Sequence, residues 1–552
     1  EIERLVQDGG LGMALHRPSG SPANEIRFKV YHPDSAVPLS DALPLFEHMG
    51  FRVMDEIPHH VTPEHSDGRE IMIHNFGLES RDGSNVNLDA ISENLKDAFA
   101  RVWSGDTESD GFNALVSGGG LTWREVVILR AYAKYLRQAG IAFSQAYMEQ
   151  TLANNPAIAR RIVDLFLAVF NPAGKARSGG AAARANRIRK QIEKDLNAVV
   201  SADEDRILRR FVNAVDSTLR TNFFQAAADG GPKPYLSFKV KSGNIEELPL
   251  PRPLYEIFVY SPRVEGIHLR FGMVARGGLR WSDRREDFRT EILGLVKAQQ
   301  VKNAVIVPVG SKGGFVVKNP PQGGDRDAFL AEGIACYKTF IAGLFDLTDN
   351  YQGTRVTPPK QVVRLDGPDP YLVVAADKGT ATFSDIANGV SEQYGHWLGD
   401  AFASGGSQGY DHKKMGITAR GGWESVKRHF REFGVDTQKQ PFTVLGVGDM
   451  SGDVFGNGML LSKQIKLIGA FNHLHIFIDP DPDPEKSFIE RKRMFKLPRS
   501  NWADYNTKLI SKGGGVLDRS AKSLRLTPEM RTLFDVPKDT VTPTELLGYM
   551  LR

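Results

Sequence analysis

Cysteine is almost absent from this sequence of 552 residues, in which Cys336 is the only one. A single thiol excludes an internal disulfide framework and favours a reducing compartment, so we expect a cytoplasmic protein in which Cys336 is a buried structural thiol. Long apolar runs are also missing, because none reaches the roughly 18 residues that span a bilayer. No membrane partner is therefore predicted. The start at Glu1, without a methionine or a signal-peptide pattern, suggests a fragment.

An excess of charge of one sign is missing too. The formal net charge is +4, which is small for this length and gives no electrostatic indication of nucleic-acid binding. The most basic stretch, NPAGKARSGGAAARANRIRK at 171–190, has no aromatic residues between its charges. A solvated helix face or a linker is therefore favoured over a nucleic-acid contact. No metal site is predicted.

The length and the changing residue patterns predict a multidomain protein with α/β and α parts. Residues 25–31 alternate like a strand, 41–49 form an amphipathic pattern that stops at Gly50, and 51–55 again suggest a strand. This β-α-β order predicts a small α/β domain over residues 1–85. Its run PLFEHMGFRVMDE resembles an ACT domain. ACT domains often bind amino acids, so an amino-acid effector is expected.

Helical spacing dominates the predicted region 86–245, for example in WREVVILRAYAKYLRQAG, which stops at Gly140. The Pro-rich stretch ELPLPRPLYE at 247–256 indicates a boundary. Strand and helix patterns then alternate, which predicts a substrate and catalytic α/β domain over 246–440. Residues 441–552 are predicted to form part of a Rossmann-type domain.

The first chemical signal runs from FGMVARGGLRWSDR to SKGGF. Paired glycines, 277 and 278, let a backbone approach a ligand, and a helix is expected over 288–300. The apolar run NAVIVPVG at 303–310 predicts a buried strand that ends in a glycine-rich loop with Lys312. Arg276, Lys302 and Lys312 suit a small dianion, and a lysine among cations acts as a general base near neutral pH. The alternative, lysines of a surface loop, is about equally favoured by the residues alone.

The second signal is YLVVAADKGTATFSD at 371–385, in which an apolar strand pattern leads to Asp377. An acid at a strand end relays protons or orients a lysine. From the residues alone, however, a helix N-cap is the commoner role for an aspartate at such a junction.

The third signal is PFTVLGVGDMSGDVFGNGM at 441–459. A strand leads into Gly446, Gly448 and Gly452 before a helix, which is typical of a dinucleotide phosphate turn, although Gly452 comes one residue late. A second strand, HLHIFID, ends in Asp479, and an acid there suits the ribose hydroxyls of NAD. Asp479 follows Gly448 by 31 residues rather than the usual ~20, so this assignment requires an insertion.

These signals, in this order, resemble the glutamate dehydrogenase superfamily, through ARGGLRWS, QQVK, PVGSKGG, AADKGT and GVGDMSG. The stretch from ARGGLRWS to PVGSKGG is specifically similar to the large bacterial NAD-dependent branch, as are segments over nearly the whole chain. PVGSKGG is one residue shorter than the family's loop.

The resemblance implies roles for the matching positions. Lys312 would activate water and polarise the substrate, and Asp377 would shuttle the proton of the amine. Lys302 and Gln299 would hold the α-carboxylate, and Arg276 would hold the side-chain carboxylate in place of the family's lysine. The cofactor-binding residues expected on the same basis are Gly446, Gly448, Asp449, Gly452, Asp479 and Thr418.

The implied reaction is oxidative deamination of L-glutamate to 2-oxoglutarate and ammonia with hydride transfer to NAD, by an enzyme that is a homo-oligomer at full length. Only about 110 residues follow Pro441, whereas a dinucleotide domain has two βαβαβ halves. We therefore expect a truncated domain and weak NAD binding by these 552 residues alone. Two alternatives stay open: a dehydrogenase for an apolar amino acid, and an effector-binding fragment without activity.

Overall fold

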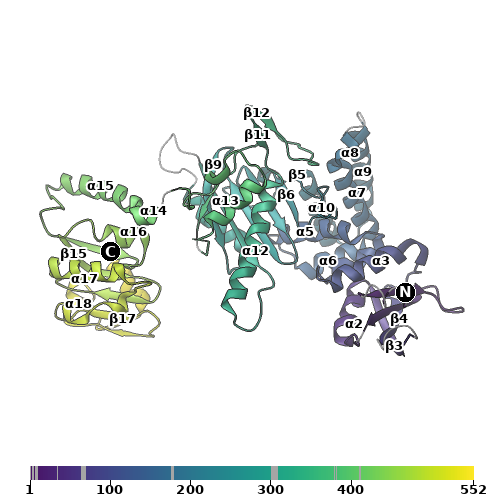
Figure 1. Ribbon diagram of the computed structural model, residues 1–552, viewed down its shortest axis with the longest axis horizontal. Coiled ribbons are helices and arrows are strands. Elements are labelled where there is room, and N and C mark those ends of the chain that lie inside the picture. Colours follow the sequence, from purple (N-terminus) through teal and green to yellow (C-terminus); the bar gives the residue numbers. More distant parts are fainter. Residues whose placement is uncertain are drawn as a thin grey trace. The chain divides into compact units, whose positions relative to one another are not determined.

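The protein divides into two compact units, Glu1–Gly406 and Ser407–Arg552. The computed structural model describes residues 2, 5, 10–33, 35–63, 70–175, 180–299, 309–377, 379–380, 382–409 and 412–552. Each unit has hydrophobic cores of its own, and Figure 1 shows the elements of both.

The first unit begins with a small α/β domain, as predicted from residues 1–85. Its four strands have the order β1-β2-β4-β3 and all pair antiparallel. One helix, α2, connects β2 and β3, and Gly50 follows it as expected. The core joins this domain to the next region, because Phe99 of α3 stacks on Phe46 with ring centroids 5.1 Å apart. The bounds are β1 Gly12–His16, β2 Glu25–Pro33, α2 Leu39–His48, β3 Phe51–Val61 and β4 Ile71–Ser80.

The helical region is confirmed in its element type and in the stop at Gly140, which directly follows α5. In the described residues, the basic stretch 171–190 lies mainly on α8 and α9, and Arg184 and Arg187 of α9 are exposed, which fits a solvated helix face. The helices are α3 Leu88–Trp103, α4 Ala114–Gly119, α5 Trp123–Ala139, α6 Gln145–Asn154, α7 Pro156–Phe170, α8 Pro172–Lys175, α9 Gly180–Leu196 and α10 Ala202–Ser217.

A seven-stranded mixed sheet in the order β13-β9-β10-β8-β7-β6-β5 forms the centre of the first unit. Two of its strands, β5 and β6, precede residue 246, where the sequence places the start of the substrate domain. The Pro-rich stretch 247–256 is thus a connection within one sheet, because β6 pairs with β7 directly after it. The strands are β5 Thr218–Thr221, β6 Leu236–Val240, β7 Tyr255–Tyr260, β8 Val264–Arg270, β9 Ala275–Trp281, β10 Val309–Val317 and β13 Val374–Ala376.

Helices cover both faces of this sheet. On one face α5 packs on the central strands, with Tyr135 against Phe238 and Phe258, and α11 (Phe288–Lys297) lies on the same side. The other face carries α12 (Arg326–Phe345) and α13 (Ser384–Gln393). The short strands β11 (Asn350–Gln352) and β12 (Arg355–Thr357) form a separate hairpin.

One helix of the described chain, α12, is long and apolar enough to cross a membrane by length and composition. Its aromatic residues Tyr337 and Phe340 pack on Phe315 of β10, with ring centroids 5.8 and 6.0 Å apart. In this fold, α12 is therefore a core helix of the sheet.

The second unit is a four-stranded sheet, β14-β15-β16-β17, with helices on both faces. The first two strands are parallel and the other pairs are antiparallel. The position 441, predicted to begin this domain, lies inside the unit between α15 and β14. The main elements are α14 His412–Met415, α15 Ile417–Glu432, β14 Phe442–Val447, α16 Asp453–Gly458, β15 Ile465–Phe471, β16 His475–Ile478, α17 Pro484–Lys496, β17 Gly515–Asp518, β18 Leu524–Arg525, α18 Pro528–Leu533, β19 Thr540–Val541 and α19 Pro543–Met550.

Candidate functional site

Lys312 lies in the middle of β10, where it pairs with Leu269 of β8. The prediction of a glycine-rich loop after a strand is wrong here, because the segment SKGGF itself is part of β10. Of the strand expected at 303–310, only the last two residues belong to the part of the chain that the structure describes. The Lys312 side chain is buried, with 7% of its surface exposed.

Asp377 directly follows β13, as predicted from the sequence. Its carboxylate accepts a hydrogen bond from the ammonium of Lys312, so the two residues form a partly buried ion pair. The helix-cap alternative does not hold, since α13 begins at Ser384 and its N-cap residue is Phe383. Thr380 fixes the turn instead: its hydroxyl accepts from the backbone N–H of Asp377 at 3.0 Å and donates to the carbonyl of Leu279 at 2.7 Å.

Arg280, for which the sequence pattern predicts no role, is a second partner of Asp377. Its Nη2 donates to Oδ1 of Asp377 at 3.2 Å, and its Nη1 donates to Oε1 of Glu291 in α11 at 2.7 Å. Burial alone would lower the pKa of Arg280, but these two carboxylates hold it above its ordinary value. The signal that could have found Arg280 is its spacing, because it lies two residues beyond Gly278 on the same face of β9.

The two adjacent glycines of β9 face different neighbours. A Cβ atom at Gly277 would lie 1.5 Å from the carbonyl oxygen of Ser311, so this glycine permits close pairing of β9 with β10 rather than the approach of a ligand. A Cβ at Gly278 would lie 3.1 Å from Cβ of Asp377 and 3.2 Å from Nζ of Lys312. Gly278 therefore lies directly beneath the Lys312–Asp377 pair.

The predicted substrate residues that the structure describes lie on or beside β9 and β10. Arg276 is exposed, and it shares the face of β9 with Gly278 since residues two apart point to the same side. It pairs with Gly310, two residues before Lys312. The carbonyl oxygen of Gln299 would be 1.8 Å from a Cβ at Gly310, which places Gln299 beside the start of β10. Lys302 lies outside the described residues.

The second unit contains the predicted glycine turn between β14 and α16. Gly448 has a φ of +135°, a backbone conformation that residues other than glycine rarely adopt. Its N–H donates to the carbonyl of Phe471 at 2.7 Å, and its carbonyl accepts from the indole of Trp502 at 2.9 Å. A Cβ at Gly446 would lie 2.2 Å from the ring of Phe455. The turn is thus a tight connection between the two parallel strands of a β-α-β unit, the position where a Rossmann-type domain has its glycine-rich turn.

The position of Asp479 corrects the sequence prediction. It follows β16, which runs antiparallel to β15, so it lies away from the strand ends that meet the glycine turn. Burial raises the pKa of Asp479, and one carboxylate oxygen accepts from the backbone N–H of Ser511 at 3.0 Å. The residue after the second parallel strand is Asn472, 24 residues after Gly448. This spacing is close to the usual ~20 residues, so an acceptor at Asn472 requires no insertion in the chain.

Other residues of the second unit surround the turn. Asp449 lies inside it and accepts from the side-chain amide of Asn472 at 2.8 Å. Gly452 is the N-cap residue of α16. Thr418 is exposed in the first turn of α15.

Comparison with known families identifies three successive segments. The model described as bacterial NAD-glutamate dehydrogenase, catalytic domain, matches residues 191–552. Those described as glutamate dehydrogenase, helical motif 3, and glutamate dehydrogenase, ACT3 domain, match residues 107–172 and 10–91. The ACT resemblance of the N-terminal domain is thereby confirmed.

Three bacterial proteins, each named NAD-specific glutamate dehydrogenase, are similar over almost the whole chain. The Pseudomonas aeruginosa protein is 55% identical over 99% of this chain and 34% of its own length, and the Halomonas elongata protein is 54% identical over 100% and 34%. The Mycobacterium tuberculosis protein is 57% identical over 93% and 33%. The chain thus spans about a third of the length of these relatives.

A solved structure of the hetero-hexameric glutamate dehydrogenase from Thermus thermophilus matches with 17% identity and a TM-score of 0.30, over 55% of this chain and 65% of that one. So low a score supports no structural argument. The match over residues 191–552 shows the family of the chain. The family that the order of the sequence motifs predicted is thereby confirmed. This chain belongs to the bacterial NAD-glutamate dehydrogenase family.

Proposed function

We propose that the full-length protein of this chain oxidises L-glutamate with NAD to 2-oxoglutarate and ammonia. The observation that carries the proposal is the partly buried Lys312–Asp377 pair over Gly278, in a chain of this family. Because the chain spans about a third of its relatives, the activity is proposed for the whole protein.

Lys312 and Asp377 would divide the acid–base chemistry. The Lys312 side chain polarises the substrate and activates the water that adds to the imine carbon of 2-iminoglutarate. Asp377, already hydrogen-bonded to Lys312, takes up and returns the proton of the departing amine. Arg276, on the same face, would hold the γ-carboxylate through its planar fork, and Lys302 and Gln299 would hold the α-carboxylate.

NAD would accept the hydride from Cα of glutamate. The residues that would hold it are in the second unit: Gly446, Gly448, Asp449 and Gly452 at the phosphates, and Asn472 at the adenosine ribose. Thr418 is proposed to contact the nicotinamide amide. The Rossmann-type interpretation of this unit rests on the β14-α16-β15 arrangement, whose tight turn fits the cofactor.

The proposal is tested by purifying the full-length protein and following reduced-cofactor absorbance with L-glutamate and L-leucine, each with NAD and with NADP. We expect turnover with glutamate and NAD that exceeds the three other combinations at least about tenfold. A preference for leucine would contradict the proposed role of Arg276, and no turnover with either amino acid would contradict the proposal itself.

Replacing Arg280 with methionine should lower kcat by about 10- to 100-fold with a smaller change in KM for glutamate. The substitution removes a cationic partner of Asp377 and leaves Lys312, so the carboxylate is held less firmly beside Lys312. Loss of the cation also disfavours the ionised carboxylate, so the acidic limb of the kcat–pH profile should move to higher pH.

Arg284→Met is the matched control, because Arg284 is a half-exposed arginine of the same segment paired with Asp287. Arg280→Lys should recover part of the lost kcat. An unchanged pH profile for Arg280→Met would show that Arg280 does not act through Asp377.

Asn472→Ala should raise KM for NAD about three- to tenfold, the value of one lost hydrogen bond, with little effect on KM for glutamate. It should also lower the melting temperature, because the Asn472 side chain bonds Asp449 and the loop that follows it. Asp479→Ala should leave KM for NAD unchanged and lower the melting temperature instead, because Asp479 is buried and bonded to Ser511. Initial rates over a range of NAD concentrations measure both variants. If Asp479→Ala raised KM for NAD and Asn472→Ala did not, Asp479 would be the ribose contact instead.

Homo-oligomerisation, an amino-acid effector, a cytoplasmic location and the domain limit at 85 stay predictions.

A further inference from the structure

A pocket of about 480 Å³ lies in the first unit between the helical region and one end of the seven-stranded sheet. Its walls come from α3, α5, the loop around Asp229 and the end of β7, and none of its lining residues belongs to the Lys312–Asp377 site. The volume is in the range of roughly 300–1,000 Å³ that small-molecule sites have.

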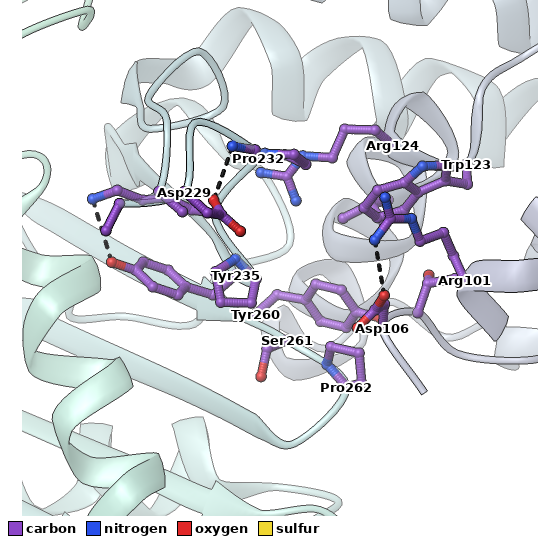
Figure 2. A pocket seen from close by; sticks show the side chains of 17 residues that line it. Arg101, Asp106, Trp123, Arg124, Asp229, Pro232, Tyr235, Tyr260, Ser261 and Pro262 are labelled. Atoms are coloured by element: carbon purple, nitrogen blue, oxygen red, sulfur yellow. Dashed lines mark hydrogen bonds and ion pairs between the residues drawn. The ribbon is translucent and has the colours of Figure 1, made fainter. Parts of the chain in front are cut away.

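Arg124, at the second position of α5, is the unusual residue of this pocket. Its Nε and Nη2 are fully buried and have no hydrogen-bond partner in the part of the chain that the structure describes. The guanidinium contacts the ring of Phe223, with Cζ 5.3 Å from the centroid. Figure 2 shows its side chain extending from α5 toward the loop that carries Asp229 and Pro232. Burial without an acidic partner lowers the pKa of Arg124 to about 10.

A buried arginine with a structural role looks different in this same helix. Arg130 is 0% exposed. It forms two bonds of 2.8 Å to the carboxylate of Asp110 and further bonds to Thr107 and Asn113. Unpaired buried donors are costly and rare in folded proteins. Arg124 thus has hydrogen-bond donors available for a ligand, whereas Arg130 uses its donors inside the protein.

Two of the three cations that line the pocket are paired with carboxylates. Arg101 is paired with Asp106 at 3.0 Å, and Lys233 is paired with Asp346. Asp229 is exposed, and its carboxylate accepts the N–H of Gly231 at 2.9 Å. Arg124 is the remaining cation of the lining, and its planar fork matches the two oxygens of a carboxylate.

The rest of the lining is flat and apolar. It consists of the rings of Trp123, Tyr235 and Tyr260 together with three prolines, at 232, 234 and 262. Arg101 lies over the Trp123 ring, with Cζ 5.4 Å from the centroid, which fixes this wall. Aromatic walls prefer a planar apolar partner.

We propose that this pocket is a binding site for a small aromatic monocarboxylate, whose carboxylate pairs with Arg124 and whose ring packs between Trp123 and Tyr235. This site is separate from the proposed glutamate site and does not depend on the proposed function.

The experiment titrates the full chain with benzoate, with the neutral isostere benzamide and with inorganic phosphate, and follows binding by ligand-observed NMR and calorimetry. Benzoate should bind saturably, and benzamide should bind at least about tenfold more weakly because it lacks the charge-assisted bonds. Arg124→Met should abolish benzoate binding, whereas Arg187→Met, a change of an exposed helix arginine, should not.

The melting temperature supplies a second readout. Arg124→Met should leave it unchanged or raise it, since an unpaired buried charge is removed, whereas Arg130→Met should lower it by several degrees. Equal binding of benzoate and benzamide, saturable binding of phosphate alone, or no saturable benzoate binding would overturn the proposal. So would retained benzoate binding by Arg124→Met, or a loss of stability in that variant like that of Arg130→Met.

Discussion

Replacing Lys312 with alanine is expected to lower kcat of the full-length enzyme by about 10²- to 10⁴-fold, the range of a lost general acid–base group. The variant retains Asp377 and its bond to Arg280, but no lysine side chain is left to activate water or polarise the substrate. KM for glutamate should change less than kcat, because Arg276 would still hold the γ-carboxylate. Steady-state rates over a range of glutamate concentrations separate the two parameters.

Lys338→Ala is the matched control, since Lys338 is an exposed lysine of α12 on the opposite side of the sheet. It should retain the parent kcat. Near-normal turnover by Lys312→Ala would remove Lys312 from the mechanism, and a large loss in Lys338→Ala would show that the assay reports instability.

Gly277→Ala should destabilise the first unit by about 3 kcal/mol or more. The new methyl group would lie 1.5 Å from the carbonyl oxygen of Ser311 and 2.5 Å from its carbonyl carbon. Both are backbone atoms of β10, so relief requires that the two strands separate. Chemical denaturation of the full chain, followed by circular dichroism, measures the free energy of unfolding.

Gly278→Ala separates folding from catalysis at the neighbouring position. Its methyl group would meet the carbonyl oxygen of Ala376 at 3.0 Å and Nζ of Lys312 at 3.2 Å, contacts that small shifts can relieve. We expect a loss of about 1 kcal/mol in stability with a clear fall in kcat, because the shifts fall on the Lys312–Asp377 pair. If Gly278→Ala were the less stable of the two variants, the assigned roles of the glycines would be wrong.

The sequence predicted that Lys312 and Asp377 act together, and the structure pairs their side chains; their catalytic roles stay a prediction. The structural environment of this pair was harder to predict from the sequence. Lys312 was placed after a strand because the run 303–310 is apolar, but the ladder with β8 continues to Val317. Paired glycines commonly indicate a loop, and here the Cβ contacts at Gly313 and Gly314 show that glycine allows close packing within β10.

Arg280 was missed as a partner of Asp377 for a different reason. It reaches Asp377 from β9, and apart from its two-residue spacing from Gly278 a contact between residues 97 apart in the sequence leaves no local pattern. Glu291 of α11 binds the same guanidinium through its other terminal nitrogen. Asp479 was preferred over Asn472 because an acid suits ribose hydroxyls. The direction of β16 determines which of the two residues lies near the glycine turn. The chain reverses in the tight connection between β15 and β16, where the side chain of Asn472 accepts from the backbone N–H groups of Leu474 and His475.

The seven-stranded sheet also determines how this protein can be divided. A fragment that begins at residue 246 would lack β5 and β6 and would present the backbone of β7 as a long, unpaired border. Such borders recruit strands from other molecules and cause aggregation. The cut that spares the sheet lies upstream of Thr218, and the family match that begins at 191 includes both strands. The proline-rich stretch, which looks like a natural place to cut, is therefore a poor starting point for any shortened version of this protein.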